Sequence, residues 1–113
     1  MSKKLIAMVI DALEEKKAKE IEVFDVADKC SFTDYMVVAS GNSNRQVKSL
    51  ANEVVMKSKA AGLPPIGVEG MDVGEWVLVD LGDVIVHVMQ PQTRSFYQLE
   101  KLWSVEVSEA EAS

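Results

Sequence analysis

Apolar side chains recur along the chain with two different periods, which together predict three helices and five strands. Over residues 3–17 and again over 44–61, apolar positions return every three or four residues, as in an amphipathic helix. A third helical stripe follows Gln90-Pro91. Runs rich in β-branched residues predict strands at 21–26, 35–40, 66–69, 76–81 and 84–89. The predicted order, α-β-β-α-β-β-β-α, is that of an α/β (α+β) fold.

Local signals mark both ends of the second helix. Ser43 stands three residues before Gln46, the spacing of a capping box. Gly62 follows the last helical position, and Pro64-Pro65 prevents the helix from continuing. Strand, helix and strand across residues 35–69 imply a right-handed parallel crossover. Because an antiparallel hairpin follows, we expect a small mixed sheet.

The strongest local signal is a tight hairpin around Gly82-Asp83. A two-residue connection pairs residue 81 with 84, 79 with 86 and 77 with 88, since side chains alternate between faces. One face is then aliphatic throughout and must be core. The other face mixes large apolar groups with an acid and an imidazole: Trp76, Leu78, Asp80, Ile85, His87 and Met89. This mixed face is either a second core under a helix or an exposed docking patch.

The length of 113 residues and the 48% hydrophobic content fit one globular domain. We expect that domain to span residues 1–103, followed by an acidic, disordered tail over 104–113. Of the net charge of −6, the tail contributes three acids and no base. The remaining body is only mildly acidic, which argues against direct, sequence-independent binding to RNA or DNA. A basic protein partner is compatible with this charge.

The chain has one cysteine, Cys30, and one histidine, His87. These counts exclude an internal disulfide, a multi-cysteine zinc site and a histidine-rich metal centre. Asp11 and Glu14 interrupt the first apolar stretch, so it is typical of neither a signal peptide nor a membrane span. We therefore expect a cytoplasmic protein that binds no cofactor, metal or membrane.

Few residues suggest catalysis. His87 lies within a strand with no adjacent acid, which favours a structural histidine over a general base. Gly41-Asn42-Ser43 at a helix start could receive a phosphate, although such a pattern is more often a turn and helix cap. Ser43, Asp80 and Asp83 keep open an alternative, an enzyme that acts on a nucleotide.

Several segments, in this order and spacing, carry a resemblance to a known family. They are Asp25-Val26, residues 33–38, residues 43–47, Val68-Glu69-Gly70, residues 76–80, residues 82–87 and residues 94–103. From Leu5 to Trp103 the chain resembles the ribosomal silencing factor (RsfS, Iojap-like) family. The resemblance implies a nucleotidyltransferase-like topology without catalysis. The enzymatic alternative is then a degenerate nucleotidyltransferase-like enzyme that acts on a nucleotide. Asp80 and Asp83 do not form the acidic pair that such enzymes need, because Leu81-Gly82 separates them.

The resemblance also implies a function. Such a factor binds the large ribosomal subunit at its intersubunit-face protein number fourteen and blocks joining of the small subunit. Translation is thereby repressed in stationary phase or starvation. The resemblance associates docking with the region of Trp76 and Leu78, and a homodimer is left open. We expect the partner-binding residues to be Trp76, Leu78, Asp80, His87 and Met89, with Glu69 and Glu75 at the rim.

Overall fold

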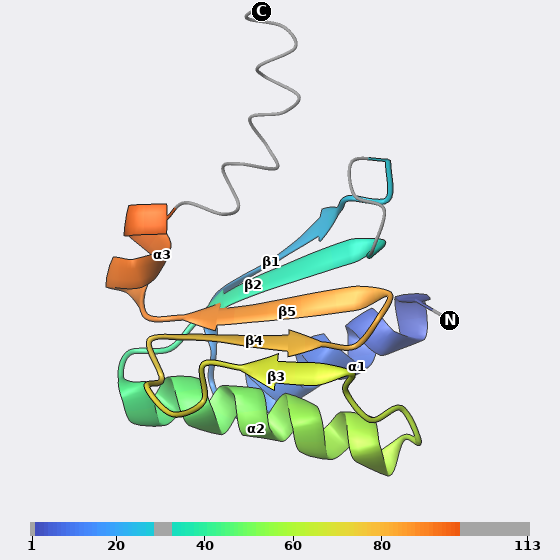
Figure 1. The fold of residues 1–113 in the computed structure, drawn as a ribbon, viewed down its shortest axis with the longest axis horizontal. Coiled ribbons are helices and arrows are strands. Elements are labelled where there is room, and N and C mark those ends of the chain that lie inside the picture. The colour runs from blue at the N-terminus through green and yellow to red at the C-terminus, as the bar shows by residue number, and fades with distance from the viewer. Residues whose placement is uncertain (1, 29–32, 98–113) are drawn as a thin grey trace, which may run out of the picture.

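The computed structural model describes residues 2–28 and 33–97. The elements follow the predicted order (Figure 1). They are α1 (Ser2–Glu15), β1 (Lys19–Asp25), β2 (Tyr35–Ser40), α2 (Asn44–Ala60), β3 (Gly67–Glu69), β4 (Trp76–Asp80), β5 (Val84–Met89) and α3 (Pro91–Tyr97). Cys30, the predicted helical residues 98–103 and the predicted tail over 104–113 lie outside the described residues.

The five strands form one mixed sheet in the order β1-β2-β5-β4-β3. β2 and β5 are parallel, and the other neighbouring pairs are antiparallel. β3 therefore runs parallel to β2, as the predicted crossover requires. The two strands are not neighbours, however, because the β4–β5 hairpin lies between them (Figure 1). The crossover through α2 thus spans the width of the hairpin.

The main core lies between one face of the sheet and the two longer helices. The predicted hairpin register is confirmed: Val77 faces Val88 and Val79 faces Val86. These four valines are fully buried, and Leu81 at the end of the same face is partly buried. The largest fully buried side chains that the helices contribute are Val9, Leu13, Val47, Leu50 and Val54. Burial of these apolar groups is the main force that holds α1 and α2 on the sheet.

Gln46 joins the beginning of α2 to the end of α1. The predicted cap is present, because the Ser43 Oγ accepts the Gln46 backbone N–H at 3.1 Å. The Gln46 Oε1 accepts the Asn42 N–H at 2.6 Å, one residue earlier than a regular capping box. Its Nε2 donates to the carbonyls of Lys16 and Lys17 at 3.4 and 3.3 Å. The same side chain therefore satisfies groups at two helix ends.

Arg94, on α3, holds a bulge in the edge strand β1. Pairing with β2 shifts register between Lys19 and Glu22, and Glu20 has a φ of 50°. The buried Arg94 guanidinium donates to the Glu20 carbonyl at 2.7 Å, to the Ser40 Oγ at 2.8 Å and to the Glu22 carboxylate at 3.1 Å. A planar, charged donor fork thus meets three acceptors from two strands.

Replacing Arg94 with alanine is expected to lower the free energy of unfolding by about 2–3 kcal/mol, because buried acceptors lose a charged donor. The half-exposed Glu22 carboxylate regains water, which limits the loss. Arg94→Lys should recover only part of it, since an ammonium lacks the fork. Urea denaturation measures the effect. Arg45→Ala on the exposed side of α2 is the control, and equal stability of the two alanine variants would contradict the role of Arg94.

Candidate docking surface

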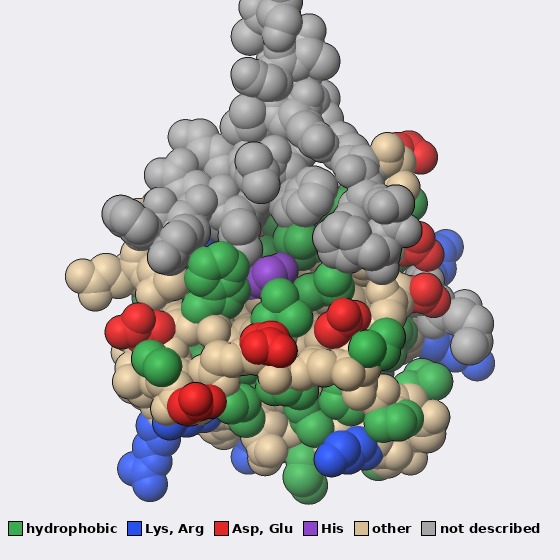
Figure 2. All heavy atoms as spheres, viewed as in Figure 1, with side chains coloured by type: hydrophobic (Ala, Val, Ile, Leu, Met, Phe, Trp, Pro, Cys, Tyr) green, Lys and Arg blue, Asp and Glu red, His purple; other side chains and the backbone are tan. Residues whose placement is uncertain are grey.

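The mixed face of the hairpin continues across the neighbouring strand. On this face Trp76 pairs with Met89, Leu78 with His87 and Asp80 with Ile85, as predicted. β2 adds Met36 beside Ile85 and Val38 beside His87. We call these eight residues the mixed face. In Figure 2 the single histidine, in purple, lies near the centre of this face among apolar side chains.

Burial divides the mixed face into two halves. On β5, Ile85 and His87 are each only 5% exposed and Met89 is fully buried. Met89 packs with Val26, Met36 and Val38 in a second, smaller hydrophobic cluster that Trp76 borders. On β4, by contrast, Trp76, Leu78 and Asp80 are all half-buried. Each interpretation that the sequence left open therefore describes one half: a second core over β5 and β2, and an accessible strip along β4.

A hydrogen bond between the two halves orients the Trp76 ring. Its Nε1–H donates to the His87 Nδ1 at 3.0 Å, and the rings are tilted by 47° with centroids 5.9 Å apart. The imidazole must be neutral to accept at Nδ1, with its proton on Nε2. Burial disfavours the charged form and lowers the pKa of His87 to about 4. His87 therefore remains a neutral acceptor at physiological pH, which gives it a structural role.

Acidic residues border the strip, and Figure 2 shows acidic side chains, in red, gathered below the histidine. Glu69 on β3 pairs with Leu78, and Glu75 immediately precedes Trp76; both are exposed. The Asp80 carboxylate accepts the Gly82 N–H at 2.9 Å and so stabilises the hairpin turn. Residues 60–93 contain five acids and no lysine or arginine: Glu69, Asp72, Glu75, Asp80 and Asp83. We call these five residues the acidic rim.

The loop over residues 70–75 is held tightly against the start of β4. Gly70 has a φ of +87°, and a Cβ there would lie 2.1 Å from the Trp76 carbonyl oxygen, so only glycine fits. The Gly74 N–H donates to the Gly70 carbonyl at 3.0 Å. The Gln90 Nε2 donates to the Gly74 carbonyl at 3.2 Å and to the Asn44 Oδ1. These contacts connect the acidic rim to the N-terminus of α2.

The residues of the enzymatic alternative have local structural roles. The Ser43 hydroxyl caps α2, and the Asp80 carboxylate binds the hairpin turn. The Asp83 carbonyl accepts the N–H groups of Asp34 and Tyr35, each at 3.0 Å. Over residues 2–28 and 33–97, no group of three or more His, Cys, Asp or Glu side chains is arranged to hold a metal ion. In the same ranges, no helix has the length and apolar character needed to cross a membrane.

The structure thus gathers Trp76, Leu78, Asp80, His87 and Met89 on one face, with Glu69 and Glu75 at its border. Their contact with a partner stays a prediction. Sequence reasoning missed the second cluster on β2, although the alternation of residues 35–40 placed Met36 and Val38 on one side of that strand. It also assigned no role to Arg94.

The depressed pKa of His87 predicts a loss of stability in acid. In the folded protein His87 stays neutral until the pH approaches about 4, whereas the unfolded chain takes up this proton near 6.5. The unfolded state therefore binds more protons within this window, and the stability that His87 contributes is lost as the pH falls from 6.5 towards 4. The free energy of unfolding should fall by about 3 kcal/mol from this residue alone.

Urea denaturation of the native chain and of His87→Gln across this pH window isolates the effect, because the acids titrate in both proteins. The variant should lack the His87 contribution to the slope. Identical pH slopes in the two proteins would contradict the prediction.

Comparison with known proteins assigns the chain to a family. Residues 1–113 match the family described as "Ribosomal silencing factor during starvation". A ribosomal silencing factor RsfS from Chromobacterium violaceum is 52% identical over 96 residues, which cover 85% of this chain and 79% of that protein. The RsfS of Bacillus subtilis is 39% identical over 101 residues, covering 89% and 86%.

A solved structure from Chromobacterium violaceum superposes with a TM-score of 0.89 at 49% identity, covering 90% of this chain and 85% of the other. Similarity in sequence and in fold thus extends over most of the chain and agrees with the resemblance seen in its motifs. The chain belongs to the ribosomal silencing factor family.

Proposed function

We propose that this chain binds the large ribosomal subunit through the β4 side of the mixed face and blocks joining of the small subunit. The contact is with the subunit's intersubunit-face protein number fourteen, and the result is repression of translation during starvation or stationary phase. Membership of the ribosomal silencing factor family supports a ribosomal partner. A mouse relative, 35% identical over 103 residues, is named for mitochondrial assembly of the ribosomal large subunit, which supports the choice of subunit.

The observation that carries the proposal is the strip along β4, where two large apolar side chains remain half-buried beside an acidic rim. Trp76 and Leu78 lie on a regular strand rather than on a loop, and the His87 hydrogen bond orients the indole. A rigid aromatic anchor loses little conformational entropy on binding. No lysine or arginine lies between residues 60 and 93, so the charge around the strip is negative. A negative surface suits a basic ribosomal protein.

His87 and Met89 are the buried cross-strand neighbours of the two anchors. Both are buried, and both pair with the half-buried anchors: His87 with Leu78 and Met89 with Trp76. In the proposal they hold the anchors in place, while Trp76, Leu78 and the rim acids Glu69 and Glu75 contact the partner. Asp80 contributes through its position in the rim and through the turn that it stabilises.

The proposed mechanism is steric and needs no chemical step. A folded domain docked at the intersubunit face occupies space that the small subunit needs, so silencing follows the occupancy of the site by mass action. The factor would act in the cytoplasm, where its target is found. No observation of the described residues favours the nucleotidyltransferase-like alternative, since Ser43 and Asp80 serve the helix cap and the turn.

Replacing Trp76 and Leu78 together with alanine is expected to weaken binding to purified large subunits by at least about 100-fold, because large apolar anchors dominate interface energy. Co-sedimentation measures binding, and circular dichroism tests folding. The control replaces Val23 on β1 and Leu63 after α2, which are exposed outside the mixed face, and should bind normally. Unfolding of the double variant would indicate that the strip is core, and normal binding would place the docking surface elsewhere.

Reversing the charge of Glu69 and Glu75 to lysine should slow association with the subunit and flatten its dependence on salt. Rim charges mainly set the association rate, whereas apolar anchors set dissociation. Stopped-flow measurements across a salt series give both rates. Reversal of Glu14 and Asp28, two exposed acids outside the hairpin, provides the matched control. An unchanged salt slope in the Glu69 and Glu75 variant would exclude steering by these acids.

A further inference from the structure

A stripe of hydrogen-bond donors runs along the outward side of α2. Each of six residues lies three or four positions from another of the set, so all six project from one side of the helix. They are Arg45, Lys48, Ser49, Asn52, Met56 and Lys59. Five of the six side chains can donate hydrogen bonds, and none is a carboxylate. We call this set the α2 stripe, and its charged ends lie about 21 Å apart along the helix axis.

The cations of the α2 stripe have no acidic partner among the described residues. The ion pairs there all involve Lys57 or Arg94. Lys57 lies on another side of α2, where it pairs with Asp11 at 3.4 Å and Glu15 at 2.8 Å on α1. This pairing holds the pKa of the Glu15 carboxyl below its usual range. Asp11 and Glu15 of α1 are therefore already paired with Lys57.

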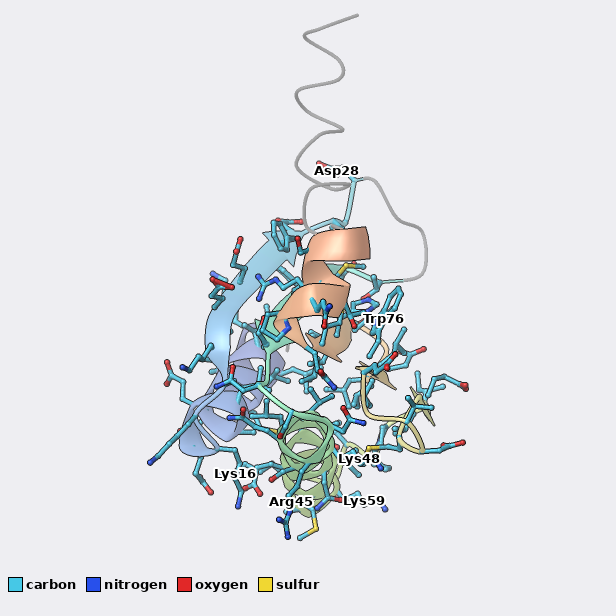
Figure 3. The ribbon with its side chains drawn as sticks, turned by 90° about the vertical axis from the view of Figure 1, so that its left-hand side faces the viewer. Lys16, Asp28, Arg45, Lys48, Lys59 and Trp76 are labelled. Carbon is cyan, nitrogen blue, oxygen red and sulfur yellow. The ribbon has the colours of Figure 1, made fainter. Side chains whose placement is uncertain are left out.

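Contacts with the rest of the fold extend and orient the stripe. The Lys48 side chain crosses Gly74, where an added Cβ would lie 2.9 Å from the Lys48 Cε. The Gln46 side chain donates to the Lys16 and Lys17 carbonyls and so holds these two exposed lysines near the beginning of the stripe. Figure 3 looks along α2, with Lys16, Arg45, Lys48 and Lys59 around the helix in this view and Trp76 well above them. The cationic surface and the docking strip are thus separate.

Acidic and basic residues are concentrated in different parts of this fold, which the net charge alone does not reveal. The 34 residues from 60 to 93 contain the five acids of the rim and no cation, whereas α2 contains four cations and one acid, Glu53. The mildly acidic average argued against a phosphate-binding footprint. An average over the chain, however, has no information about where the charges lie.

We infer that the α2 stripe binds the phosphate backbone of RNA, which in the docked state is ribosomal RNA beside the protein that the β4 strip contacts. The identity of the RNA rests on the proposed function. Lys, Arg, Ser and Asn are the side chains that contact phosphates without reading sequence. Cations spread over about 21 Å suit an extended polyanion rather than a single ion. A membrane surface does not fit, because the apolar side of α2 is buried in the core.

The first test uses the full chain and a short RNA duplex in a salt series. Affinity should fall as salt rises, and Arg45→Gln with Lys59→Gln should reduce the slope of log affinity against log salt by about 2, one per lost phosphate contact. Both residues are exposed and form no ion pair within the described structure, so folding should be preserved. The matched control, Lys3→Gln with Lys4→Gln in the first turn of α1, removes equal charge and should keep the slope.

Three results of the first test would overturn the inference. One is no RNA binding at low salt, and another is an equal loss of slope in the control variant. The third is equally tight binding of polyglutamate, which would indicate an acidic protein ligand instead of RNA.

The second test uses purified large subunits. The Arg45 and Lys59 variant should still bind them, with a smaller salt slope than the native chain. The Trp76 and Leu78 variant should lose the subunit yet bind the RNA duplex like the native chain. Both variants could bind subunits normally while the first test still shows RNA binding by the stripe. The docking strip would then be wrong, and the α2 stripe would not contact the ribosome. If only the stripe variant matches the native chain on subunits, the inference fails and the proposed function remains.

Discussion

The rest of the structure depends on the need to cover β5 on both faces. All six residues of this strand are buried, and it lies between β2 and β4 in the middle of the sheet. One face is covered by α1 and α2 through the main core. The other requires a second cluster, in which Met89 packs with Val26, Met36 and Val38. Because this cluster is narrower than the sheet, it covers β5 but leaves the outward side of β4 half-buried. The accessible strip is thus a direct result of how the central strand is covered.

Much of the fold could be predicted because its signals are local. The hairpin register follows from a two-residue turn and from the alternation of side chains, so the pairing of Val77 with Val88 was fixed by sequence spacing. The beginning of α2 followed from Ser43 and Gln46 in the same way. The position of the hairpin between β2 and β3 could not be predicted, since strand order depends on contacts between distant segments. Three acceptors of Arg94, 54 to 74 residues away in sequence, could not be predicted for the same reason.

The residues of the candidate site could be predicted, but the burial of their side chains could not. Alternation placed Trp76, Leu78 and His87 on one side of the hairpin. Whether each is accessible depends on what β2 and β1 place beside it, and Val38 and Val26 come from segments that the hairpin sequence does not contain. Charge gave a similar result. The composition gave the net value correctly, yet only the arrangement of α2 against the rest of the fold separates its cations from the acids of residues 60–93.

The two edges of the sheet differ in how they discourage strand addition. An exposed edge presents unpaired N–H and C=O groups, which can recruit a strand from another molecule and start amyloid-like assembly. At one edge, the bulge that Arg94 holds interrupts β1, and Lys19, Glu20 and Glu22 place charges along it. At the other edge, β3 has only three residues. Neither edge is a long, regular template, so the folded chain is protected against self-propagating aggregation through its sheet.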